Sequence, residues 1–115
     1  DFSSKEFPNL SLYVSSSNLS NADLSNRDFT KLLFVTDSNS DDGVKFIYSD
    51  LSNSIFKNVN LTDSDFTGAN LSNVDFTGAN LSNADLTDAN LQGANLSGAN
   101  LENTNLSCYN HEICK

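Results

Sequence analysis

A large apolar residue recurs at every fifth position over most of the chain, and from residue 46 to residue 106 every such centre is Leu or Phe. The thirteen centres are Phe46, Leu51, Phe56, Leu61, Phe66, Leu71, Phe76, Leu81, Leu86, Leu91, Leu96, Leu101 and Leu106. One face of an α-helix recurs every 3.6 residues and one face of a β-strand every two. A period of five fits neither, so the pattern indicates an internal repeat of five-residue units.

The other positions of each unit follow their own rules. Two residues before the centre the side chain is small, most often Ala, and one residue before it is nearly always Asn or Asp. Two residues after the centre, eleven of the thirteen units have Gly, Asn or Asp, which tolerate the positive φ that the third residue of a type II turn requires. The pattern therefore predicts one turn per unit, with the small residue and the centre directed inward and the Asn or Asp outward.

Four such turns close a square, so each coil is predicted to take twenty residues. Stacked coils would lie about 4.8 Å apart and share backbone hydrogen bonds. The centres would then form four ladders: Phe46, Phe66, Leu86 and Leu106; Leu51, Leu71 and Leu91; Phe56, Phe76 and Leu96; Leu61, Leu81 and Leu101. The sequence thus predicts an all-β solenoid in which Phe rings stack along two opposite sides.

A second run of centres lies upstream and is out of phase with the first by two residues. It comprises Val14, Leu19, Leu24, Phe29 and Phe34. We expect residues 36–43 to fill one unit and to carry a two-residue loop insertion. Phe34 would then lie beneath Phe56, and the whole repeat would make about five coils.

Both ends of the chain depart from the repeat and are predicted to be caps, because a solenoid must cover the open edges of its terminal coils. The first segment contains Pro8, which cannot donate a hydrogen bond to a β-ladder. In the last segment, Tyr109 and Ile113 are expected to cover the final coil. The predicted divisions are an N-terminal cap at 1–13, a repeat domain at 14–107 with the loop insertion at 36–43, and a C-terminal cap at 108–115.

The two cysteines, Cys108 and Cys114, lie six residues apart in the last segment. A disulfide between them suits a compact exported domain. It requires a loop or broken turn there, because six residues of α-helix rise about 9 Å, which is too far for a bridge. Free thiols are the alternative, and the spacing also offers Cys108, His111 and Cys114 to zinc, although a structural zinc site takes four ligands. We expect no bound metal.

The pattern resembles the pentapeptide-repeat family, whose units read A(D/N)LXX, as in the stretch ANLSN at 79–83. The resemblance extends over about residues 12–108 and implies a right-handed quadrilateral β-helix. The stretch 36–43 and the two ends depart from the family pattern.

Composition narrows the functions that such a solenoid could have. The formal net charge is −9, and no Lys or Arg occurs between residues 58 and 114, which argues against binding nucleic acid. No apolar run has the length of a membrane span. The chain has one His, no nucleophile–base pair and no phosphate loop, so we expect a monomer without enzymatic activity or cofactor.

Two non-enzymatic functions remain from different classes. The first is a structural or protein-interaction module, whose ordered rows of polar side chains, such as Asn60, Asn80 and Asn100, would contact an unidentified protein partner. The second is implied by the family, some members of which resemble duplex DNA and inhibit DNA gyrase; here the rod, of about 23 Å, is short for that role. An ice-binding face is not expected, because Thr67 and Thr87 align but the row is not continued by Thr. The paired cysteines favour the periplasm or the thylakoid lumen over the cytoplasm.

Overall fold

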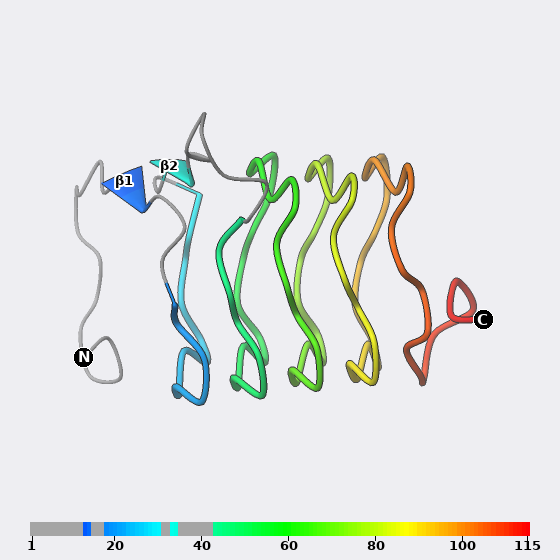
Figure 1. Cartoon of the computed structure of the whole chain (residues 1–115), viewed down its shortest axis with the longest axis horizontal. Helices are drawn as coiled ribbons and strands as arrows, with labels where there is room; N and C mark the ends of the chain where they lie inside the picture. The colour runs from blue at the N-terminus through cyan, green and yellow to red at the C-terminus, as the bar shows by residue number, and fades with distance from the viewer. Residues whose placement is uncertain (1–12, 15–17, 31–32, 35–42) are drawn as a thin grey trace.

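The computed structural model describes residues 13–14, 18–30, 33–34 and 43–115. Nearly all of the predicted N-terminal cap and of the 36–43 stretch lies outside the described residues. Two short strands, β1 (Tyr13–Val14) and β2 (Leu33–Phe34), pair in parallel with a register of twenty residues. Beyond them the chain winds as a series of stacked coils (Figure 1).

From Lys45 to Asn105 the coils are joined by parallel bridges between residues that lie twenty positions apart. Lys45 pairs with Asp65 and Asp65 with Asp85, and the same register holds on the other sides of the coil. Each side of a coil contributes a single bridging residue. Backbone hydrogen bonds join neighbouring coils at these bridges, for example from the amide of Leu71 to the carbonyl of Asn90 at 2.7 Å. Four five-residue sides per coil make the molecule a four-sided parallel β-helix, and the predicted period of twenty is confirmed.

The corners are four-residue turns of the predicted kind. The carbonyl of Phe66 accepts a hydrogen bond from the amide of Ala69 at 2.9 Å, and Gly68 between them has a φ of +67°. All residues at this position from Tyr48 to Asn103 have φ between 57° and 73°. Gly, Asn and Asp recur here because they adopt this left-handed conformation with little strain.

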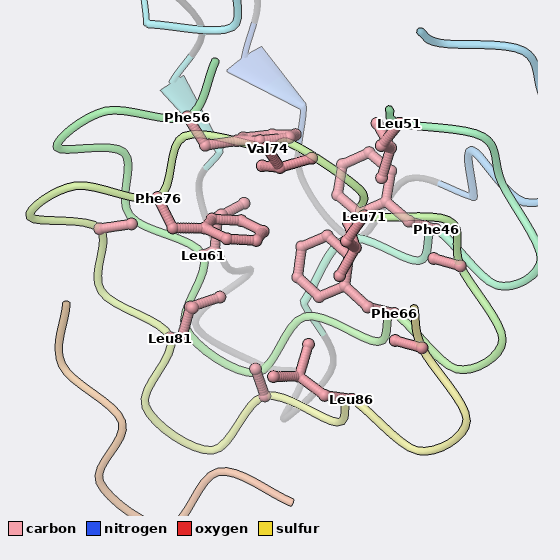
Figure 2. Packing of buried hydrophobic residues seen from close by; sticks show 14 of the residues in the cluster. Phe46, Leu51, Phe56, Leu61, Phe66, Leu71, Val74, Phe76, Leu81 and Leu86 are labelled. Carbon is pink, nitrogen blue, oxygen red and sulfur yellow. The ribbon is translucent and has the colours of Figure 1, made fainter. Parts of the chain in front are cut away.

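The interior is filled by the repeat centres. Those from residue 46 to residue 91 are at most 1% exposed, and the phenylalanines stack between coils as predicted (Figure 2). The rings of Phe46 and Phe66 lie 5.0 Å apart between centroids, those of Phe56 and Phe76 lie 5.5 Å apart, and Phe66 meets Phe76 edge-on at 5.8 Å. Such aromatic pairs stabilise the fold by more than their buried area alone.

The register across the 36–43 stretch differs from the prediction. Asp23 pairs with Asp50, and Asp28 pairs with Ile55, so partners there lie 27 residues apart. The ring of Phe29 therefore stacks on that of Phe56, with centroids 4.6 Å apart. The prediction that Phe34 lies beneath Phe56 was wrong, because a register of 27 residues makes Phe29 and not Phe34 the residue that lies beneath Phe56.

The C-terminal end is less completely buried than the middle. Leu96, Leu101 and Leu106 are half-buried, and Ile113 packs against the core from the final segment. Tyr109 does not cover the last coil as predicted. It extends the ladder by pairing with Asn90, and its side chain is 50% exposed.

Candidate interaction surface

The outward Asn and Asp residues have a structural task on the sides of the coil. The Oδ1 atom of Asp65 accepts a hydrogen bond from the amide of Thr67 at 2.9 Å and another from its hydroxyl. Asn60 does the same with the amide and hydroxyl of Thr62, at 3.1 and 2.6 Å. Each of these side chains thus satisfies a backbone amide two residues later, in the manner of an Asx-turn.

This bond fixes which atom each residue presents to the surroundings. Oδ1 is held against the backbone, so Asn exposes its amide donors and Asp exposes its second carboxylate oxygen. In the row formed by Asn60, Asn80 and Asn100, every Oδ1 is used in this way, and no Nδ2 has a partner among the described residues. The predicted outward rows are therefore present, but their bonds run mainly within one side rather than along the stack.

The same bonds act on the acidic side chains. The hydroxyl of Thr77 and then its backbone amide donate to Asp75 and hold the pKa of that carboxyl below its ordinary value of 3.8. Ser25 lowers the pKa of Asp23 in the same manner. Hydrogen bonds to a carboxylate favour its charged form, so these sides stay negatively charged in mildly acidic solution.

Sequence reasoning missed the partner of these carboxyl and amide groups. The signal was nonetheless present, because Asn or Asp is followed two residues later by Ser or Thr in most units, as at 60–62, 65–67, 70–72 and 75–77. A residue pair with this spacing is the usual composition of a side-chain turn.

Exposed apolar side chains are rare on this polar surface, and one of them occupies a strained position. Tyr48 is 66% exposed and has a φ of +57°, a conformation that a bulky residue seldom adopts. Its ring lies against Gly68 of the next coil, where an added methyl group would come within 2.4 Å of two ring carbons. Tyr109 and Ile55 are the other exposed large apolar residues in the described part of the chain.

The C-terminal segment folds back on the last coils and is closed by a disulfide between Cys108 and Cys114. Nε2 of His111 lies 3.1 Å from the carbonyl oxygen of Ala94, and its Nδ1 accepts the amide proton of Ile113 at 3.2 Å. A cavity of about 380 Å³ lies beside these residues. Because both sulfurs are bonded to each other and both imidazole nitrogens are engaged, the zinc alternative is not realised. No cluster of metal-binding side chains occurs among the described residues.

A family model for pentapeptide repeats matches residues 42–78 and 69–107, which together form more than half of the chain. The chain belongs to the pentapeptide-repeat family. Pentapeptide-repeat proteins form right-handed quadrilateral β-helices, which agrees with the four-sided coil described above. No curated protein matches the chain. Within the described residues, no helix is long and apolar enough to cross a membrane.

Several solved structures of pentapeptide-repeat proteins are similar to this chain. A protein of the cyanobacterium Cyanothece 51142 is 32% identical, with a TM-score of 0.69, and the match covers 79% of this chain and 57% of that one. A protein of the Arabidopsis thaliana thylakoid lumen is 26% identical, with a TM-score of 0.68, and the match covers 80% and 59%. This chain therefore spans less than two thirds of either relative.

QnrB1, a plasmid-mediated fluoroquinolone resistance protein, is also similar, with 25% identity, a TM-score of 0.39, and coverage of 80% of this chain and 61% of that one. The comparisons therefore identify the family of this chain but no specific role for it.

Proposed function

We propose that this chain is a non-enzymatic interaction module, a rigid rod whose sides present fixed polar groups to a protein partner. The observation that carries the proposal is the locking of Oδ1 in the outward Asn and Asp side chains. Ordering a side chain on binding costs free energy, and here that cost has already been met in folding. A pre-oriented row of donors or acceptors is therefore well suited to recognition.

The absence of a catalytic role is part of the same proposal. His111, the single histidine of the chain, uses both ring nitrogens for backbone contacts, so it is poorly placed to act as a general base. The carboxylates lie on the open sides of the coil, where water screens them. Ser97 and Glu112 also line the cavity beside His111, and among the described residues no hydrogen bond joins the Ser97 hydroxyl to either His111 or Glu112.

The proposal is tested by placing one bulky residue on each side of the rod. Four exposed residues, one per side, directly follow a repeat centre, and only their backbone amides bond to the neighbouring Asn. The four variants are Gln92→Arg, Ser97→Arg, Glu102→Arg and Ser107→Arg. Each keeps the amide bond of the side, so the coil should stay intact, which far-UV circular dichroism checks.

The wild type and the four variants are then used to capture proteins from an extract of the native source. We expect a partner that one variant fails to capture and that the other three retain. If all four variants capture the same proteins as the wild type, none of the sides is used and the proposal fails. The alternative of gyrase inhibition remains a separate prediction, which a DNA supercoiling assay at micromolar protein tests.

We also propose that the protein functions in an oxidising compartment such as the periplasm or the thylakoid lumen. The disulfide and the lumenal relative support this location. We also propose that residues 108–115 cap the rod. There are five upstream centres and thirteen downstream ones, and at four centres per coil they make about four and a half coils. Alkylation of the native protein with and without reduction, followed by mass measurement, tests the redox state.

A further inference from the structure

The backbone bonds that join the coils stop at residues 95–104. One coil earlier, the amide of Phe76 donates to the carbonyl of Asn95 at 2.8 Å. In the opposite direction, the amide of Asn100 donates to the carbonyl of Ala79 at 2.9 Å. The corresponding groups of the last coil have no hydrogen-bond partner among the described residues, and they are the amides of Leu96, Gly98, Leu101 and Asn103 and the carbonyls of Ala99 and Thr104. We call these six groups the open edge.

Residues 108–115 lie at the same end of the stack (Figure 1) but bond to other parts of the last coil. The amide of Leu91 donates to the backbone of this segment at 3.1 Å, and the carbonyl of Leu106 accepts from it at 2.8 Å. His111 contacts the carbonyl of Ala94, just before the open edge begins. None of the hydrogen bonds of the segment therefore goes to the open edge.

The side chains beneath the open edge are also incompletely covered. Leu96 and Leu101 are half-buried, whereas Phe76 and Leu81, which hold the same places one coil earlier, are fully buried. A cavity of about 380 Å³ lies beside Leu96, with Ile113 in its wall, and this volume is within the range of pockets that hold ligands. The edge thus combines free backbone groups with partly exposed apolar surface.

We propose that the open edge binds an extended segment of another protein that has the repeat pattern of this chain. The segment has large apolar residues at positions i and i+5, and Gly or Asn at i+2, where the corner requires positive φ. The occupant is inferred from the interface between coils, which this edge continues, because each coil pairs in parallel with the one before it. Addition of an extended segment to an exposed edge is a common mode of peptide recognition. This contact uses the end of the rod and does not depend on the sides proposed above.

A second copy that presented the same edge would fit poorly. Two facing open edges hold eight amides and four carbonyls, so at one bond per carbonyl at least four amides stay unpaired, and unmade hydrogen bonds are costly. The edge of a coil that faces the preceding coil has the complementary proportion. On the side of residues 75–79, the carbonyls of Asp75 and Thr77 accept bonds from the coil before, and the amide of Asp75 donates one.

The probe is the peptide DFTGANLSNA, acetylated at one end and amidated at the other. It has the sequence of residues 75–84, which lie on residues 55–64 in the folded protein. Its terminal carboxamide supplies the amide that faces Thr104. A control peptide, DGTFANLSNA, exchanges the Phe and the Gly, so that its composition and charge are equal and its apolar residues are three positions apart.

Each peptide is titrated into the intact, oxidised, isotope-labelled protein, and amide hydrogen exchange is followed by NMR. Ordering the peptide offsets much of the contact free energy, so we expect a dissociation constant of about 0.3 mM for the first peptide. The control peptide should bind at least about fivefold more weakly, because it cannot place an apolar residue over both Leu96 and Leu101.

The exchange of individual amides shows where the peptide lies. At about nine-tenths occupancy, the four amides of the open edge should exchange about tenfold more slowly, because only the free protein exposes them. Gly93 and Leu106 are the internal control, since their amides are also unpaired in the last coil but lie outside the predicted path. Their exchange should change by less than about 1.5-fold.

Two substitutions of the same kind separate the edge from a general effect on stability. Leu101→Ala removes apolar surface beneath the open edge, and Leu106→Ala removes it from the next side, where the C-terminal segment bonds. Both leucines are half-buried, so both variants should fold, which urea unfolding checks. We expect Leu101→Ala to weaken binding of the first peptide about fivefold and Leu106→Ala to weaken it by less than about 1.5-fold.

The proposal is overturned by equal binding of the two peptides, by equal effects of the two variants, or by equal changes at the open edge and the control amides. It is also overturned if about 5 mM peptide changes no exchange rate. Exchange at the open edge that slows with rising protein concentration alone would assign the edge to a second copy and refute the proposal. None of these outcomes affects the use of the sides, which the four arginine variants test separately.

Discussion

Two buried serines at the same repeat position should respond in opposite directions to replacement by alanine. Ser54 and Ser64 both lie two residues before a centre and are at most 1% exposed. The hydroxyl of Ser54 donates to the carbonyl of Leu24 at 2.9 Å and accepts the amide of Arg27 at 3.2 Å. The hydroxyl of Ser64 has no hydrogen-bond partner among the described residues.

The magnitudes follow from these contacts. A buried hydroxyl without a partner has lost its hydration at a cost of about 1–3 kcal/mol, so Ser64→Ala should raise the free energy of unfolding by about 1 kcal/mol. Ala84, directly above in the stack, shows that the position accepts alanine. Ser54→Ala removes two bonds and should lower the free energy of unfolding by about 2 kcal/mol.

Equilibrium urea unfolding of the oxidised protein measures both effects. With an m-value of about 2 kcal/mol per molar urea, a difference of about 3 kcal/mol separates the two midpoints by about 1.5 M. The matched pair controls for the loss of side-chain volume, which is the same at both sites. If Ser64→Ala lowers the midpoint as far as Ser54→Ala does, the reasoning from the unpartnered hydroxyl is refuted.

Three further measurements probe the ends, corners and charges. Reduction of the Cys108–Cys114 bond should lower the free energy of unfolding by about 2 kcal/mol, from the loop-entropy relation for seven residues, and a protein with both cysteines changed to serine should show no response to reductant. Gly78→Ala should lower the free energy of unfolding, measured in urea, more than Gly98→Ala does. Both glycines have positive φ, but only at 78 would the added methyl group meet a side-chain oxygen of the coil below, Oδ1 of Asn58, at 2.1 Å. Equal losses of stability in the two variants would contradict this. The folded pKa of Asp75 lies below 3.8, so its ionised carboxylate stabilises the fold above the unfolded pKa, and this stabilisation is lost as pH falls through the folded pKa. Asp75→Asn should therefore flatten the decline of the urea midpoint with falling pH below about pH 4. An unchanged slope of midpoint against pH would argue against this role.

The sequence predicts the coil itself because one local rule recurs in every unit. A residue suited to positive φ two positions after each centre sets the corner, and repetition of that corner fixes the register of twenty. The length of the insertion could not be obtained in this way. A phase shift of two is the same for two or for seven additional residues when the period is five, and Phe29 and Phe34 are equally good partners for Phe56.

The candidate surface was predicted less completely than the coil. The outward direction of Asn60, Asn80 and Asn100 followed from alternation, whereas the hydrogen bonds that hold them required coordinates or attention to the Ser and Thr that follow. The sequence shows that Tyr48 occupies a corner position where most units have Gly, Asn or Asp. Only the structure shows that its ring lies against Gly68. The position of Tyr109 could not be foreseen because the repeat fails there.

In each outward Asn or Asp, Oδ1 bonds to the backbone and the other terminal atom is exposed, and this separation of roles also affects how the molecule can evolve. Oδ1 performs the same structural task in both residue types, as Asn60 and Asp65 illustrate, so exchanging one for the other leaves the backbone bond in place. The exposed atom, however, changes from a donor to a charged acceptor. The charge of a side can therefore change one residue at a time, while the stability of the fold stays nearly the same. Rods of the same architecture can then acquire very different partners without passing through unstable intermediates.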